Sequence, residues 1–131
     1  AGWAYNNFPY MGNNFLPPIL LNEKLYPISE LFNDIGFIQF FHRLLASLTL
    51  IYVLITFFYL FKSKLKAIYY LATFVTIIAI SQYLLGIIML KLFVPIHLGL
   101  SHQLGSLILL SSLIITKCEI IKRRAINRPS F

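Results

Sequence analysis

The sequence predicts an all-α integral membrane protein, because most of its length consists of apolar stretches long enough to cross a bilayer as helices. Hydrophobic residues make up 59% of the 131 residues and charged residues only 11%, whereas soluble domains carry roughly 25% charged residues. The mean hydropathy is +0.79. A chain of this composition cannot cover its apolar surface by folding on itself, so the lipid bilayer is its first predicted partner.

Residues 1–35 are predicted to form an extramembrane loop on the outer side of the membrane. This segment is rich in asparagine, proline and aromatic residues, and its prolines prevent one continuous helix. A short helix is expected around Ser29–Asn33, with Ser29 as its N-cap.

Three predicted spans form a transmembrane bundle over residues 36–116. They cover residues 36–61, 67–93 and 96–116. At 1.5 Å per residue the first span is about 39 Å long, which exceeds the ~30 Å thickness of the hydrocarbon core. Pro95 ends the second span and can begin the third helix, because its fixed φ suits a first helical position.

The basic residues set the predicted orientation of these spans. Lysines fill the short loop at 62–66, and residues 117–131 form a basic tail. By the positive-inside rule both segments face the inner side, which places residues 1–35 and the turn near Pro95 outside. The net charge of +7 therefore marks membrane flanks, and no nucleic acid is expected as a partner.

His42 and His102 occupy equivalent depths in two of the predicted spans. Each lies six residues inside the outer end of its span, about 9 Å at the helical rise. One turn after each histidine comes a small side chain, Ala46 or Ser106. This arrangement leaves room for a flat macrocycle, and two such faces would hold a haem iron through axial ligands from both sides. The alternative is that each histidine only hydrogen-bonds a neighbouring helix.

Other polar residues in the spans suggest supporting roles. His97 lies five positions before His102, about 140° around a helix, so we expect it to point elsewhere and not to be a ligand. Gln82 and Gly86 are four residues apart and are first of all typical of a close-packing helix face.

Three residues are candidates for contacts with the cofactor. Arg43 and Lys91 can each neutralise a haem propionate, or each can extend to the lipid headgroups. Gln39 lies one turn before His42 and can orient the His42 ring through its free nitrogen. Equally, Gln39 can bridge two helices.

Four segments of the sequence resemble the C-terminal half of haem A synthase, and more narrowly the alphaproteobacterial and mitochondrial type of that family. They occur in the same order as in the family. They lie within YNNFPYMG at 5–12, FIQFFHRL at 37–44, QYLLGI at 82–87 and VPIHLGLSHQ at 94–103. Together they cover nearly the whole chain except its tail.

The resemblance implies a membrane oxidoreductase that converts haem O to haem A for cytochrome oxidase assembly. The family has two related four-helix halves, each with a histidine pair, and this chain would supply three helices of one haem-binding half-bundle. It would lie in a bacterial cytoplasmic membrane or a mitochondrial inner membrane. The implied partners are the N-terminal half of the same enzyme, haem O synthase and cytochrome oxidase assembly factors.

Carried over to this sequence, His42 and His102 match the histidine pair of the second half as axial ligands of haem b. In the first half, which binds haem O as substrate, a glutamate tied to catalysis precedes the first histidine by three residues. Here that position is Gln39, and a neutral amide cannot act as a general base. The resemblance therefore implies an electron-transfer haem, no catalytic residue in this chain, and no activity of the fragment alone.

Two other function classes stay open from the sequence. One is a b-type membrane cytochrome without haem-modifying activity. The other is a non-catalytic membrane assembly subunit in which the histidines only form hydrogen bonds.

Overall fold

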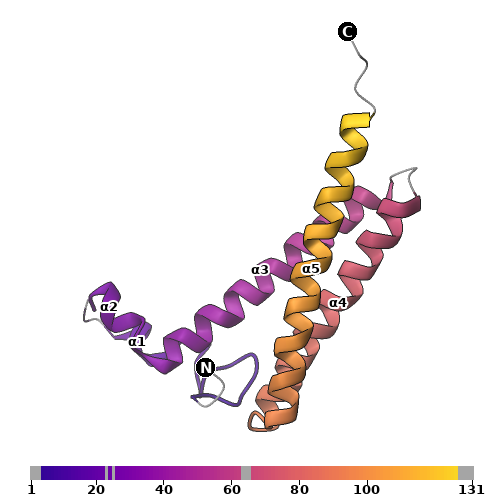
Figure 1. The fold of residues 1–131 in the computed structure, drawn as a ribbon. Coiled ribbons are helices and arrows are strands. Elements are labelled where there is room, and N and C mark those ends of the chain that lie inside the picture. Colours follow the sequence, from indigo (N-terminus) through magenta and orange to yellow (C-terminus); the bar gives the residue numbers. More distant parts are fainter. Residues whose placement is uncertain (1–3, 23, 25, 63–65, 127–131) are drawn as a thin grey trace.

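The computed structural model describes residues 4–22, 24, 26–62 and 66–126. Its helices are α1 (Pro18–Leu21), α2 (Ile28–Leu31), α3 (Ile35–Phe61), α4 (Lys66–Lys91) and α5 (Ile96–Ile126) (Figure 1). Among the described residues the only β-type pairing is one isolated bridge, between Met11 and Asn14. Three of the helices, α3, α4 and α5, are long and apolar enough to cross a membrane. The predicted all-α fold with three membrane-length helices is confirmed.

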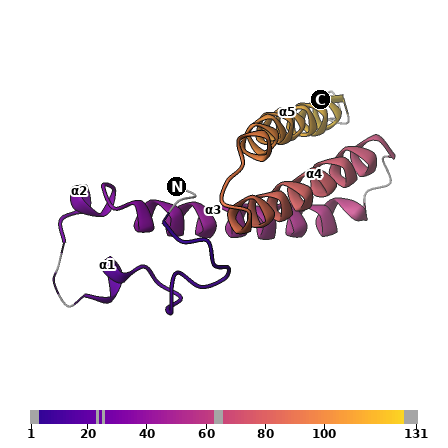
Figure 2. The same cartoon turned by 90° about the horizontal axis from the view of Figure 1, so that it is seen from below.

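The central helix of the three is α4, which packs against both α3 and α5. Figures 1 and 2 show that α4 and α5 run alongside each other, whereas α3 crosses them obliquely and diverges toward its N-terminal end. The N-terminal segment (residues 4–17) lies at that diverging end, near the α4–α5 turn, and the C-terminal end of α5 lies at the opposite end (Figure 1).

The start of α3 is fixed by a side-chain cap. Asp34 has an extended backbone, and its carboxylate accepts a 2.6 Å hydrogen bond from the Phe37 amide, which satisfies one free donor of the first turn. The short α2 differs from expectation, because Pro27 is its N-cap and Ser29 lies inside the helix. The fixed φ of proline already holds the backbone extended at that position.

The α4–α5 turn shortens the second helix relative to the predicted span. Phe93 and Val94 adopt φ of 60° and 56°, and their amides donate to the carbonyls of Leu90 and Met89. This is a Schellman arrangement, which ends a helix by turning the next residues into the left-handed region. The helix therefore ends at Lys91 and not at residue 93.

At its other end, α5 continues to Ile126, past residue 116 where the third span was expected to finish. Its apolar, membrane-length part extends to Arg123. Part of the predicted basic loop (63–65) and the end of the predicted tail (127–131) lie outside the described residues. The predicted boundaries between loop, bundle and tail remain predictions.

A small apolar cluster holds the three long helices together. Its buried members are Val53, Val75 and Ala79, and Leu50, Leu109 and Leu113 pack against them. Buried hydroxyls beside this cluster belong to Thr76, Ser112 and Thr116, and each donates to a carbonyl of its own helix. A hydroxyl satisfied in this way can be buried between helices without a partner on the neighbour.

Labelling of Cys118 tests the orientation of the bundle. Cys118 is the only cysteine of the chain, is exposed, and lies about 33 Å along α5 from Ile96. We expect a membrane-impermeant maleimide to label it only after the membrane is permeabilised. As a control, Asn13→Cys in a Cys118→Ser background should be labelled in intact cells or mitoplasts. Labelling of Cys118 in intact samples would contradict the predicted orientation.

Candidate functional site

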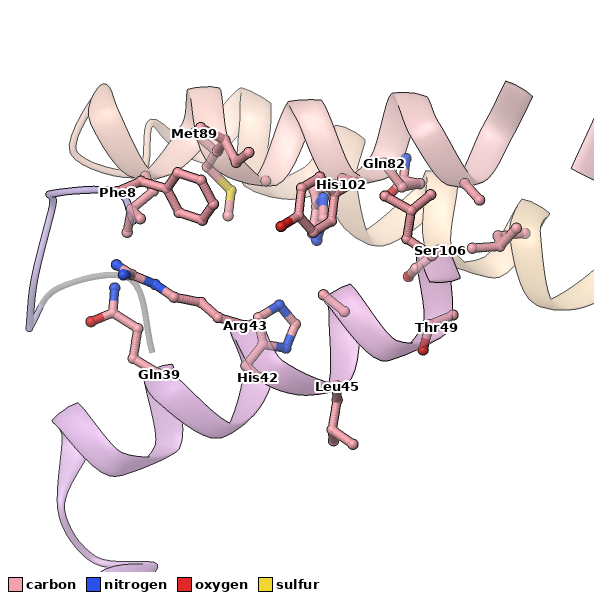
Figure 3. Close-up of a pocket in the computed structure, with 18 residues that line it drawn as sticks. Phe8, Gln39, His42, Arg43, Leu45, Thr49, Gln82, Met89, His102 and Ser106 are labelled. Atoms are coloured by element: carbon pink, nitrogen blue, oxygen red, sulfur yellow. The ribbon is translucent and has the colours of Figure 1, made fainter. Parts of the chain in front are cut away.

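A cavity of about 390 Å³ lies where α3 diverges from α4 and α5 (Figure 3). This volume is within the range of about 300–1,000 Å³ that is usual for ligand pockets. Residues of all three helices and one residue of the N-terminal segment line it. Its lining includes Phe8, Gln39, His42, Arg43, Ala46, Thr49, Leu50, Ala79, Gln82, Gly86, His102, Ser106 and Leu109.

The structure brings His42 and His102 together across this cavity. Their ring centroids are 6.4 Å apart and their ring planes make an angle of 72°. Two metal–imidazole bonds of about 2 Å each, with two ring radii of roughly 1 Å, would place the centroids about 6 Å apart. The separation of the two rings is therefore large enough for a single metal ion between them.

The His102 ring packs on α4 at Gly86, where the helix has no side chain. A Cβ atom built at Gly86 would lie 3.3 Å from Cε1 of His102, closer than ordinary van der Waals contact. The Nδ1 atom of His102 is buried without a hydrogen-bond partner. This leaves Nε2 as the nitrogen available to a ligand in the cavity.

From the histidines the cavity extends along α3 toward the apolar cluster that joins the helices. Its α3 wall runs from His42 past Ala46 to Leu50, about 12 Å along the helix. Leu50, Ala79 and Leu109 line the cavity and also belong to the apolar cluster that joins the helices. Both predicted small residues, Ala46 and Ser106, line the cavity.

Gln39 has a role that neither of its sequence interpretations anticipated. It lines the cavity but is only 3% exposed. Its Oε1 accepts a 3.0 Å hydrogen bond from the Tyr5 amide, and its Nε2 donates a 2.7 Å bond to the Tyr5 carbonyl. The side chain thus pairs with the backbone of the N-terminal segment and joins that segment to α3.

Arg43 binds the same segment. Its guanidinium donates to the carbonyls of Tyr5 (3.0 Å), Tyr10 (3.2 Å) and Pro9 (3.5 Å) and lies 5.8 Å from the Phe8 ring centroid. Its Nε is buried without a partner. These contacts hold Phe8 against the cavity, where its ring also meets Tyr83 edge-on at 6.5 Å.

Lys91 and His97 lie outside the histidine cavity. Lys91 lines a neighbouring hollow with Asn6, Asn7 and Tyr10, and Phe8 forms part of the wall of both spaces. His97 is exposed and does not line the cavity. Nothing in the sequence indicates that Phe8 belongs to the site. This loop residue reaches the cavity only because Gln39 and Arg43 bind the backbone on either side of it.

One family of known proteins matches most of this chain. Residues 1–114 match the sequence model of the COX15-CtaA family, described as cytochrome oxidase assembly protein. The chain belongs to this family. Its relatives include the heme A synthase of Rickettsia prowazekii, 38% identical over 114 residues, which cover 87% of this chain and 34% of that protein. No solved structure matches.

Two further members of the COX15-CtaA family show how widely the similarity extends. The heme A synthase of Paramagnetospirillum magneticum is 35% identical over 85% of this chain and 30% of its own length. Heme A synthase COX15 of Mus musculus is 36% identical over 85% of this chain and 27% of its own length.

The chain thus spans about a third of the length of the curated relatives it matches. The resemblance to haem A synthases is confirmed. With its three membrane-length helices, this family member is an integral membrane protein.

Replacing Gln39 with glutamate tests its contact with the N-terminal segment. A carboxylate keeps the acceptor for the Tyr5 amide but loses the donor to the Tyr5 carbonyl, at a cost of about 1–3 kcal/mol. We expect the population with a released segment to rise roughly tenfold, seen as faster chymotrypsin cleavage near Tyr5 and Tyr10. Gln103→Glu, at an exposed position of α5, should cleave like the unmodified protein.

The Gln39→Glu variant has an internal control. Protonation of the introduced carboxylate at low pH restores a donor, so the cleavage rate should return toward that of the unmodified protein as the pH falls. Equal cleavage rates of both proteins at neutral pH would contradict the pairing of Gln39 with Tyr5.

Proposed function

We propose that this chain is a haem-binding part of a haem A synthase, in which His42 and His102 are the axial ligands of a b-type haem. The observation that supports this most strongly is the 6.4 Å separation of the two rings across a cavity. The names of the relatives add that the enzyme's chemistry concerns haem. A haem with two histidine ligands transfers single electrons and has no open coordination position for a substrate.

The lining of the cavity suits such a group. The small side chains of Ala46 and Ser106 leave the faces of both helices open beside the rings, and Leu50 and Leu109 offer apolar contacts deeper in the membrane. The buried, unpartnered Nδ1 of His102 argues against the alternative in which this histidine serves only as a hydrogen-bonding residue between helices.

The basic residues lie at the end of the cavity nearest the N-terminal segment. Arg43 lines the histidine cavity and has an unpartnered Nε, so we assign it to one propionate. Lys91 lies beyond Phe8 in the neighbouring hollow, so we assign it to the second. Both would neutralise carboxylates at the membrane surface, where charge is least costly.

We further propose that the conversion of haem O to haem A takes place in another part of the enzyme. None of the described residues that line the cavity is an aspartate or glutamate, and the Gln39 amide is committed to the Tyr5 backbone. With both histidines assigned to the iron, no carboxylate in the cavity lining is left to act as a general base. The role left for this chain is to bind the electron-carrying haem. Haem O synthase and cytochrome oxidase assembly factors remain its proposed partners.

Loss of either histidine tests the ligand pair. We expect His42→Ala and His102→Ala to abolish the low-spin haem spectrum of the protein purified from membranes, because each removes one axial ligand. His97→Ala should leave the spectrum unchanged, since His97 is exposed and outside the cavity. An unchanged low-spin spectrum in His102→Ala would refute the assignment.

Adding one methyl group at Gly86 tests the placement of His102. In Gly86→Ala the ring must shift away from the new Cβ, which lies 3.3 Å from Cε1. Displacing the ring from its rotamer costs about 0.5–1.5 kcal/mol, so haem affinity should fall about two- to tenfold. Gly99→Ala on α5 is the control, because its new Cβ meets only the Met89 sulfur, at 4.0 Å. Equal haem affinity in the two variants would contradict this placement.

A further inference from the structure

Two glycines and two polar side chains interlock where α4 meets α5. A Cβ atom at Gly105 would lie only 1.8 Å from Nε2 of Gln82, and one at Gly86 would lie 3.3 Å from Cε1 of His102. Each polar side chain therefore lies directly on a glycine of the opposite helix. Glycine allows such close approach between membrane helices because it has no side chain.

The spacing of these four residues makes the two polar side chains neighbours. Gln82 precedes Gly86 by four residues on α4, and His102 precedes Gly105 by three residues on α5. Each interval is about one helical turn, so the Gln82 amide lies roughly one turn from the His102 ring. Both side chains line the same cavity, and Figure 3 shows both on its α4–α5 side.

Each of these side chains has a buried polar atom without a partner. The atoms are Oε1 of Gln82 and Nδ1 of His102. An unmade hydrogen bond at a buried group costs about 1–3 kcal/mol. The two atoms are complementary, because a histidine that binds a metal through Nε2 carries its proton on Nδ1, and an amide oxygen accepts.

Other polar groups on this side of the cavity already have partners. The Ser106 hydroxyl donates to the Gln103 carbonyl at 2.7 Å, and the Tyr83 hydroxyl is hydrogen-bonded to the Ser47 hydroxyl at 3.1 Å. Of the described side chains on the α4–α5 side, the Gln82 amide is the one with an unused buried acceptor.

We propose that Gln82 is a positioning residue for His102. When the haem is bound, its Oε1 accepts a hydrogen bond from the Nδ1–H of His102, which fixes the tautomer with Nε2 directed at the cavity. This inference rests on the proposed function, since it concerns the histidine as an iron ligand. A hydrogen bond to the far nitrogen raises the basicity of a ligating imidazole, so Gln82 would favour the ferric state of the haem.

Redox titration of Gln82 variants tests this role. In Gln82→Glu a stronger acceptor should shift the ferric-to-ferrous equilibrium about tenfold toward ferric haem, lowering the midpoint potential by about 59 mV for a one-electron couple. In Gln82→Leu the loss of the acceptor should raise the potential. Both variants should keep low-spin haem. The matched controls are Gln103→Glu and Gln103→Leu, because Gln103 is exposed next to His102 and is not part of the cavity lining.

The outcomes separate this inference from the proposed function. Low-spin haem in the unmodified protein, with opposite shifts in the two Gln82 variants and none in the controls, supports the inference. Low-spin haem with an unchanged potential in Gln82→Leu overturns the inference and leaves the haem assignment intact. If Gln82→Leu does not fold, a potential in Gln82→Glu equal to that of Gln103→Glu overturns it. Absence of haem from the unmodified protein overturns the proposed function itself.

Discussion

The close contact between α4 and α5 is the constraint on which the site depends. Without a side chain at Gly86 and Gly105, the two helices approach until Gln82 lies on Gly105 and His102 lies on Gly86. The ring of His102, packed on Gly86, has its centroid 6.4 Å from that of His42 on the diverging α3. Helix association in a bilayer depends on such packing, because lipid offers no hydrophobic drive between apolar helices. The same glycines that let the helices pack thus determine where a metal could be held.

The N-terminal segment completes the site by a different kind of contact. Gln39 presents both a donor and an acceptor to the Tyr5 backbone, as a neighbouring strand would. A carboxylate at this position could not do both while ionised, which gives a structural reason for an amide here. Because Arg43 binds three carbonyls of the same segment, Phe8 is held at the cavity. The two residues that bind the N-terminal segment, Gln39 and Arg43, thus lie about one turn apart on α3, and His42 lies between them in the sequence.

The sequence was sufficient for the long helices and for the proximity of His42 and His102. Long apolar runs can satisfy their backbone in lipid only as helices, and equal spacing from the span ends brought His42 and His102 to one level. The roles of Gln39, Phe8 and Gln82 could not be predicted, because each depends on a contact with another element, and such contacts have no periodicity. The turn that ends α4 has no sequence signal for a related reason. Phe93 occupies a left-handed position where glycine is the usual sequence signal.

The uneven burial of the two histidines bears on how the haem would be enclosed. His102 is half-buried against α4, whereas His42 is exposed on α3. A macrocycle between them would be covered by protein on the α4–α5 side and only partly covered elsewhere by the described residues. An imidazole is costly to leave in contact with lipid. Since the chain spans about a third of its relatives' length, we propose that another part of such an enzyme covers His42.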